Sequence, residues 1–285
     1  MTDQKTEFHV PVLRRAFSLR ARPLLKHHTV ISQSWNGPEL SIAVFTDLHV
    51  VSPWVSLDDI SRIASQITNL KPDLIILAGD FLASHIMPGR RASASQVIDA
   101  LGELRAPLGV LGVLGNHDWR DCPVAKASNF RENSVVDAIS ASHIHLLQNS
   151  CLPLEHHGKE FWMVGLDSQR PVHKDRSVAF HQPDLAYRGI PDGANSVLVA
   201  HEPDYFADGD TRSALQISGH THGGQMNLFG WRPMTPSIYG GRYAYGHYHE
   251  QGRDLVVSGG IGFSGLPLRI AQPPEVTLIT LRGAT

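Results

Sequence analysis

The fold is decided by an apolar strand that ends in polar residues, LSIAVFTDLH at residues 40–49. The same arrangement recurs in LIILAGD (74–80), GVLGVLGNHD (109–118), SVLVAH (196–201) and ALQISGHTH (214–222). Between the first two strands, Ile60, Ile63 and Ile67 follow the spacing of one buried helix face, with Ser56 as a potential N-cap. Strands that alternate with helices predict parallel crossovers and an α/β fold.

The rest of the chain extends this pattern. Further helices are expected near residues 97–104 and 135–142, and later strands near 161–166, 255–258 and 276–281. The sequence contains no internal repeat and no linker-like segment. We therefore expect one domain over residues 39–285, preceded in residues 1–38 by a basic arm and an edge strand.

The polar residues at the strand ends have the chemistry of metal ligands. In open α/β sheets, ligands bind outside the carboxyl ends of the strands. The candidate ligands are Asp47, His49, Asp80, Asn116, His201, His220 and His222. One ion takes about four to six donors, so this set fits two ions if one carboxylate bridges them. The mixture of oxygen and nitrogen donors suits Mn²⁺, our first expectation, with Fe or Zn²⁺ as alternatives.

Each motif alone is weak, because Asp-x-His and Gly-Asp are common in turns and Asn-His-Asp is typical of helix caps. Their joint order along the chain carries the signal. In this order they resemble the calcineurin-like metallophosphoesterases, and in particular the bacterial branch with GHTHGGQ, here residues 219–225. The resemblance runs from about residue 40 to residue 281. It implies a two-sheet β-sandwich flanked by helices, with the metals at one edge.

The resemblance also implies roles for individual residues. The first metal would be held by Asp47, His49, Asp80 and His222, and the second by Asp80 as a bridge, Asn116, His201 and His220. His117 would act as a general acid or phosphate contact, oriented by Asp118. Two departures from the family pattern are Thr46 in place of Ser, and Val50-Val51-Ser52 in place of a frequent Gly.

The implied activity is hydrolysis of a phosphodiester or pyrophosphate bond by in-line attack of a metal-bridging hydroxide. Protein phosphatases of this superfamily carry an Arg after the Gly-Asp pair, whereas Phe81-Leu82-Ala83 follows here, which disfavours that class. We expect Trp54, Trp119 and Arg120 to contact the substrate. Phe229 and Trp231 also flank the polar motifs, and such residues form either an apolar binding patch or the core. Arg269 is a further candidate for a phosphate contact.

Related bacterial enzymes cleave the pyrophosphate of UDP-2,3-diacylglucosamine in lipid A synthesis, so a small-molecule or lipid-linked phosphoester is the expected partner. The alternatives are a metal-dependent nuclease, a cyclic nucleotide phosphodiesterase, and a non-enzymatic scaffold on the same fold. The net charge of −2 gives no bulk attraction for nucleic acid. A scaffold is disfavoured because all of the expected ligands are present.

Composition bounds the location of the protein. The longest apolar runs have about five residues, against the roughly 20 that a membrane-spanning helix needs. Two cysteines, Cys122 and Cys151, form no CxxC pair and suit a reducing compartment. We expect a cytoplasmic protein. Residues 1–28 carry six cationic and two acidic side chains, a composition that suits a solvated arm leading into the first edge strand and, as the alternative, peripheral contact with the inner membrane.

Overall fold

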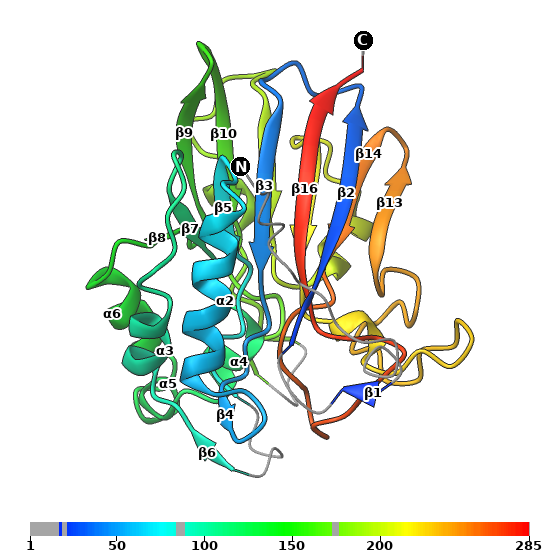
Figure 1. The fold of residues 1–285 in the computed structure, drawn as a ribbon. Helices are drawn as coiled ribbons and strands as arrows, with labels where there is room; N and C mark the ends of the chain where they lie inside the picture. The colour runs from blue at the N-terminus through cyan, green and yellow to red at the C-terminus, as the bar shows by residue number, and fades with distance from the viewer. Residues whose placement is uncertain (1–16, 19–21, 84–88, 173–176, 285) are drawn as a thin grey trace, which may run out of the picture.

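Two six-stranded sheets form the centre of the computed structural model, which describes residues 17–18, 22–83, 89–172 and 177–284. The first sheet has the order β2 (Leu24–Ser32), β16 (Glu275–Gly283), β3 (Leu40–Phe45), β5 (Leu74–Leu77), β7 (Val110–Gly112), β8 (His145–Leu146). The second has the order β13 (Gly246–Glu250), β14 (Arg253–Val257), β12 (Leu215–Ser218), β11 (Ser196–Val199), β10 (Lys159–Gly165), β9 (Ser150–His156). Figure 1 shows the sheets as neighbouring layers.

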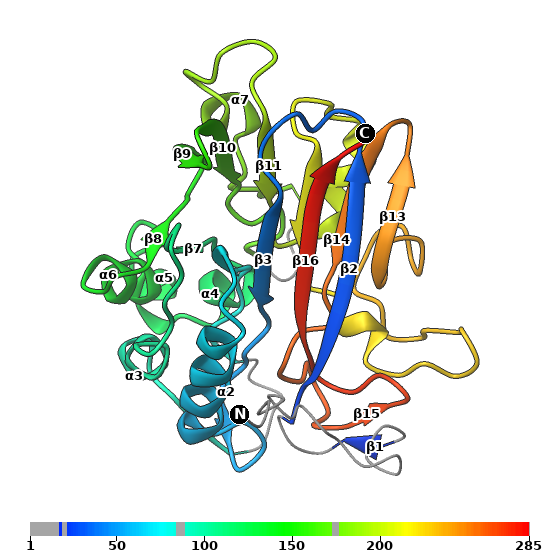
Figure 2. The ribbon, with the colours of Figure 1, turned by 45° about the horizontal axis from the view of Figure 1, so that its top comes forward.

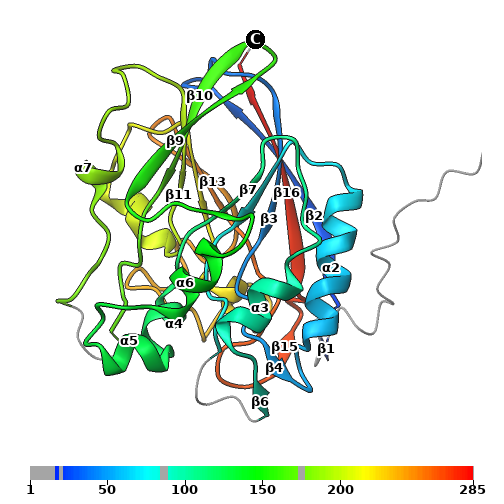
Figure 3. The ribbon, with the colours of Figure 1, turned by 90° about the vertical axis from the view of Figure 1, so that its left-hand side faces the viewer.

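Helices cover the outer faces of the two sheets. The longest is α2 (Leu57–Asn69), and the shorter ones are α3 (Ala94–Ala100), α4 (Asn116–Arg120), α5 (Pro123–Ala127), α6 (Ser134–Ser140) and α7 (Pro183–Ala186). In Figure 3, α2 and α3 lie beside the first sheet, and α7 lies on the far side of the second. Two 3₁₀ helices span Pro203–Asp208 and His222–Gly224. The predicted α/β fold, a two-sheet sandwich flanked by helices, is confirmed.

The apolar strand runs are explained by burial on both faces. In β3, Ile42 and Val44 point into the core between the sheets, whereas Ala43 and Phe45 pack against the helices, because successive side chains of a strand alternate. A strand buried on both sides reads as a continuous apolar run rather than an alternating one.

Helix α2 forms as its sequence predicts. Ser56 Oγ accepts a hydrogen bond from the Asp59 backbone N–H at 3.1 Å, and Asp59 Oδ2 accepts one from the Ser56 N–H at 3.1 Å. This capping box satisfies two backbone groups at the helix start. Ile60 and Ile63 are fully buried against the first sheet.

Two short antiparallel pairs lie outside the main sheets. Strand β1 (Phe17–Ser18) pairs with β15 (Arg269–Ile270), and β4 (Val51–Ser52) pairs with β6 (Arg90–Arg91). The predicted edge strand is β2, which pairs with β16 along its whole length. Most of the predicted basic arm, residues 1–16 and 19–21, lies outside the described residues. No helix within the described ranges has the length and apolarity needed to cross a bilayer.

Candidate metal centre

The loops that follow β3, β5, β7, β11 and β12 meet at one edge of the sandwich, at the lower end of the molecule in Figure 1. Backbone hydrogen bonds join them: the Asp47 N–H donates to Gly79 O at 3.0 Å, and the Gly219 N–H donates to His201 O at 3.0 Å. Side chains join them as well, since the His117 N–H donates to Asp80 Oδ1 at 2.8 Å. Segments up to 173 residues apart in the chain, as Asp47 and His220 are, thus become direct neighbours.

All of the predicted ligands are buried in this edge. Three groups have potential ligand atoms within 4.8 Å of one another, namely Asp47–His49–His222, His49–Asp80–His117 and Asp80–His201–His220. Asp80 belongs to two groups, and its Oδ2 lies 3.1 Å from His201 Nε2 and 3.5 Å from His49 Nε2. The three groups therefore adjoin, with His49 common to the first two and Asp80 common to the last two.

Carbonyl oxygens fix which nitrogen of each imidazole faces the centre. His49 Nδ1 donates to Leu82 O at 2.9 Å, and His201 Nδ1 donates to Ala78 O at 2.6 Å. The His49 ring therefore directs an unprotonated Nε2 toward the cluster. His201 directs its Nε2 at Asp80 Oδ2, and although burial opposes protonation, the Asp80 carboxylate raises the pKa of His201 well above its usual range. His220 is reversed, because its Nε2 donates to Pro236 O at 2.9 Å and leaves Nδ1 as the inward atom. Such outer contacts are the usual support of metal-binding histidines.

Unpaired polar atoms indicate what the edge is built to hold. Both side-chain atoms of Asn116 are buried without a hydrogen-bond partner, and His201 Nε2 makes no well-formed hydrogen bond. Buried polar groups are otherwise paired in nearly all cases, because an unpaired one costs about 1–3 kcal/mol. A divalent cation would satisfy Asn116 Oδ1 and His201 Nε2, whereas the Asn116 Nδ2 donor needs an acceptor. The carboxylate, amide and imidazole groups of this edge together fit such a cation.

The charges at this edge depend on burial. Desolvation raises the pKa of Asp47 to about 7, because water no longer stabilises its ionised form, and the neighbouring Asp80 adds to the rise. Burial also opposes ionisation of Asp80, but His201 and His117 hold its pKa well below the usual range. Desolvation lowers the pKa of His49 to about 3, with His117 contributing. A bound cation would oppose the rise at Asp47, because it favours the ionised carboxylate, and would add to the effect that keeps His49 neutral.

The backbone that carries the ligands is held in an uncommon conformation. Asp47, His49, Asp80, His220 and His222 all have positive φ, between 42° and 69°, a region that side-chain-bearing residues seldom occupy away from functional sites. Strain of this kind persists only where surrounding contacts impose it.

Glycines allow the loops to approach one another at the centre. A Cβ on Gly115 would lie 2.2 Å from Asp80 Oδ1, and one on Gly219 would lie 2.4 Å from Asp47 Oδ2. Gly79 adopts φ +92°, which favours glycine. The glycines that precede Asp80, Asn116 and His220 in the sequence are thus required by the geometry of the centre.

His117 and Asp118 have different surroundings from those expected. Asp118 does not contact the His117 ring. Its carboxylate instead accepts the backbone N–H groups of Asp80, Gly115 and Leu82 at 2.9–3.0 Å, which holds the Gly79–Asp80 turn. The His117 ring is oriented by Asp121, whose Oδ2 lies 2.5 Å from His117 Nδ1. The i, i+4 spacing of His117 and Asp121 at the α4 helix was the available signal.

Of the three expected substrate contacts, Arg120 lies nearest the cluster, since its guanidinium contacts His117 Nε2. Trp54 is half-buried and packs against the core under α2. Trp119 is buried, donates its indole N–H to Asp167 Oδ1 at 2.7 Å and packs edge-on against Phe180. The Trp119 indole is therefore engaged with Asp167 and Phe180, inside the protein, and not with a substrate site.

Arg269 is fully buried and does not face a substrate. Its guanidinium donates to Gly259 O at 2.7 Å and to Gly262 O at 2.6 Å, and it lies 3.1 Å from His222 Nδ1. Arg269 thus joins the GHTHGG loop to the loop that follows β14. The expectation of a phosphate contact is wrong for this residue, because its donors are engaged with protein acceptors.

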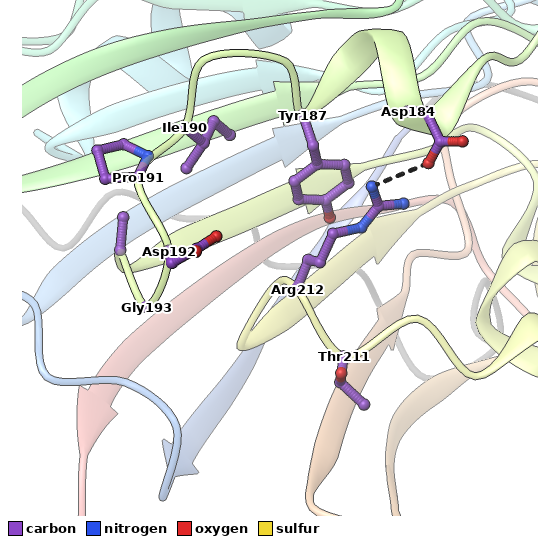
Figure 4. Close-up of a pocket in the computed structure, with 9 residues that line it drawn as sticks. Asp184, Tyr187, Ile190, Pro191, Asp192, Gly193, Thr211 and Arg212 are labelled. Atoms are coloured by element: carbon purple, nitrogen blue, oxygen red, sulfur yellow. Dashed lines mark hydrogen bonds and ion pairs between the residues drawn. The ribbon is translucent and has the colours of Figure 1, made fainter.

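A cavity of about 470 Å³ lies away from the metal edge, beside α7 (Figure 4). Arg212, which lines it, contacts Asp184 and stacks 4.0 Å over the Tyr187 ring. Asp210 pairs with the same guanidinium at 2.7 Å. The Arg212 guanidinium is thus paired within the protein, and the lining of this cavity contains none of the predicted metal ligands, so we place the chemistry at the convergent strand ends.

Comparison with known proteins identifies the family of the chain. Residues 40–224 match the family model of the calcineurin-like phosphoesterases. The uncharacterized metallophosphoesterase YkuE of Bacillus subtilis is 31% identical over 89% of this chain and 82% of its own length. An uncharacterized metallophosphoesterase of Aquifex aeolicus is 23% identical over 87% of both chains. A putative metallophosphoesterase of Caenorhabditis elegans is 28% identical over 86% of this chain, which spans about half of that relative.

Proposed function

The chain belongs to the calcineurin-like phosphoesterase family, and from that premise we propose that it cleaves a phosphodiester or pyrophosphate bond with two divalent cations. Hydrolysis of a phosphoester bond follows from the family. The observation that supports the finer proposal is the row of three adjoining ligand groups, which are joined through His49 and Asp80. Two bound cations would supply charge neutralisation at phosphorus and would lower the pKa of a water molecule.

Side chains of the protein would hold the two cations and contact the phosphoryl group. In the proposed assignment, Asp47, His49, Asp80 and His222 hold one cation, and Asp80, Asn116, His201 and His220 hold the other. His117 lies at the edge of the first cluster, with its ring centroid 4.6 Å from that of His49. With Nδ1 bound to Asp121, its Nε2 is the nitrogen that would contact a phosphoryl oxygen or protonate a leaving group once the Arg120 guanidinium, which contacts Nε2 here, has moved aside. The neighbouring Arg120 would contribute positive charge beside it.

The native metal and the substrate are two further proposals. Mn²⁺ suits the oxygen and imidazole donors, with Fe or Zn²⁺ as alternatives. We propose a lipid-linked nucleotide such as UDP-2,3-diacylglucosamine as substrate, which would place the protein in lipid A synthesis. The absence of an Arg after Gly79–Asp80 supports a substrate other than a phosphoprotein.

The test combines metal content with hydrolysis. Protein purified without chelator is expected to hold two metal ions per chain and, with added Mn²⁺, to cleave bis-p-nitrophenyl phosphate. Asp80→Ala and Asn116→Ala should abolish activity and metal content together. His117→Ala should retain the metal and lower turnover by about 10²–10⁴-fold. His249→Ala is the control, because this imidazole on β13 is exposed and bound to Asp254.

Three results would count against the proposal. One ion per chain at saturating Mn²⁺ would refute the two-cation centre. Wild-type turnover in His117→Ala would refute the role of His117. Equal kcat/KM for UDP-glucose and UDP-2,3-diacylglucosamine would refute recognition of the acyl chains.

A further inference from the structure

The carbonyl group that orients His220 lies in a segment without a helix or strand. Residues 225–245, which connect the 3₁₀ helix His222–Gly224 to β13, form turns and isolated bridges. Figure 2 shows part of this segment (yellow) as a long loop below β13. Pro236 lies within it, and its carbonyl oxygen accepts the Nε2–H of His220 at 2.9 Å. The orientation of His220 therefore depends on what fixes Pro236 in place.

Two other imidazoles of the centre are oriented from a more regular part of the fold. His201 Nδ1 donates to Ala78 O and His49 Nδ1 donates to Leu82 O, and both acceptors lie in the loop that directly follows β5. That strand is paired on both sides within the first sheet. His220 differs from them because its acceptor is far from any sheet strand in the sequence and needs side chains to hold it.

A buried carboxylate, Asp204, holds the two residues that follow Pro236. Asp204 lies on the 3₁₀ helix after β11, three residues beyond His201, and is only 5% exposed. Its Oδ1 accepts the Ser237 hydroxyl at 2.5 Å, and its Oδ2 accepts the Ile238 N–H at 3.1 Å. The turn that presents Pro236 O is therefore fastened to the loop that carries His201.

Arg170, from the loop after β10, completes this attachment. Its Nη2 donates to Asp204 Oδ2 at 2.7 Å, and its Nη1 donates to Pro236 O at 3.3 Å. The Arg170 N–H in turn donates to Oε1 of the buried Glu202 at 3.3 Å. Hydrogen bonds between ionised groups are roughly twice as strong as neutral ones. We call Arg170 and Asp204 the Pro236 clamp, since together they hold the carbonyl that receives His220.

We propose that Asp204 and Arg170 are positioning residues for the second cation of the proposed centre, the cation to which His220 is assigned. The Pro236 clamp keeps Pro236 O where it accepts the Nε2–H of His220, so that Nδ1 directs its lone pair at the cation. Without the clamp, the carbonyl would shift and the imidazole would be free to turn. The first cation takes no ligand from His220 and should be affected little. This inference rests on the two-cation centre proposed above.

The experiment titrates the metal-free full chain with Mn²⁺, followed by calorimetry and by electron paramagnetic resonance. Asp204→Ala should weaken the second Mn²⁺ by about 10–100-fold, the usual effect of losing an outer partner of a ligand, and should leave the first nearly unchanged. At Mn²⁺ concentrations that give wild type the signal of a coupled pair, Asp204→Ala should show the hyperfine spectrum of an isolated ion. Arg170→Met should weaken the second site in the same direction, and Arg170→Lys, which keeps the charge beside Asp204, should weaken it less.

The matched control is Asp210→Ala. Asp210 lies on the same connection between β11 and β12, and its carboxylate pairs with Arg212 at 2.7 Å, the same distance as the Asp204–Arg170 pair. Its described contacts, which are Arg212 and the Tyr205 hydroxyl, include no support of a predicted ligand. Asp210→Ala should therefore bind both Mn²⁺ ions as wild type does. Melting temperatures of the metal-free variants check that each is folded.

A second readout needs no metal. In long-range ¹H–¹⁵N spectra of the metal-free protein, the His220 ring should carry its proton on Nε2 in wild type and in Asp210→Ala. In Asp204→Ala the ring should exchange between its two tautomers, because Pro236 O no longer selects one. The His220 signals are assigned by their absence from His220→Ala.

The outcomes separate this inference from the proposal it rests on. A single Mn²⁺ per wild-type chain would refute the two-cation centre, and the His220 tautomer would then still test the Pro236 clamp. Two ions held with wild-type affinity by folded Asp204→Ala would overturn the clamp and leave the two-cation centre intact. Equal weakening of both ions would also overturn it. If Asp204→Ala is unfolded, Arg170→Met decides, and wild-type affinity for both ions in that variant would overturn the clamp.

Discussion

Replacement of Arg269 by Met tests how the metal edge is held together. Burial lowers the pKa of this guanidinium from 12.5 to about 10, although Asp47, Glu275 and Tyr245 oppose the change; the net shift corresponds to a cost of roughly 3 kcal/mol at about 1.4 kcal/mol per pKa unit. Met removes that cost but leaves the carbonyls of Gly259 and Gly262 and the Nδ1 of His222 without their donors. Three unpaired buried acceptors cost about 3–9 kcal/mol. The net loss is centred near 3 kcal/mol, or about 6–12 °C in melting temperature.

The assay is thermal unfolding of the metal-free and Mn²⁺-loaded protein, together with calorimetric titration of Mn²⁺. Arg269→Met should weaken Mn²⁺ binding as well, because the backbone that carries His222 loses the contact between its carbonyl and Arg269. The control is Arg242→Met, which removes an exposed guanidinium paired with Glu250 at 2.8 Å and should leave melting and Mn²⁺ binding nearly unchanged. If Arg269→Met melted within about 2 °C of wild type, the reasoning that this buried charge holds the two loops would be refuted.

Three further changes test the same edge. Gly115→Ala should lose Mn²⁺ binding because its Cβ would overlap Asp80 Oδ1. The control Gly241→Ala, which has open space around it, should bind Mn²⁺ as wild type does. Equal Mn²⁺ affinities of the two variants would contradict this prediction. Asp118→Asn should lower the free energy of unfolding by about 1–3 kcal/mol, measured by urea denaturation, because an amide cannot accept all three N–H groups; wild-type stability would argue against its structural role. Desolvation raises the pKa of Asp47 to about 7. Binding of Mn²⁺ to Asp47 must displace this proton, so Mn²⁺ affinity should increase from pH 6 to pH 8 with proton release. In the metal-free protein the folded state keeps the proton that the unfolded state loses, so stability should fall as pH rises from about 4 through 7. Affinity that is flat with pH would contradict the Asp47 assignment.

Much of the fold could be predicted because burial leaves a clear pattern in the strands. Residues 74–77 read as a continuous apolar run, and β5 is buried on both faces. Helix α2 combined its apolar stripe with the Ser56 capping box. Strand β9 was missed because its side chains alternate only weakly, with half-buried and exposed positions and no fully buried one.

The candidate ligands could be listed from sequence because they follow buried strands whose carboxyl ends share one edge. Their supporting residues could not. Arg269 lies 47 residues from His222, and only the fold shows that its guanidinium serves carbonyl groups. Asp118 and Asp121 are equally plausible partners of His117 by proximity in sequence. The direction of a side chain at the start of α4 separates them, since Asp118 turns back to the N–H groups at the helix start while Asp121 lies one turn along from His117.

These supporting contacts explain how the strained ligand backbone persists. Asp80 has a positive φ of 58°, and its own N–H is held by Asp118. His222 has a positive φ of 52°, and Arg269 contacts both its carbonyl and its ring. A left-handed residue costs about 1–3 kcal/mol unless its surroundings impose it. One buried carboxylate and one buried guanidinium, neither of which binds a metal ion, thus constrain opposite sides of the centre. Loss of either should therefore reduce metal affinity even though every ligand is still present.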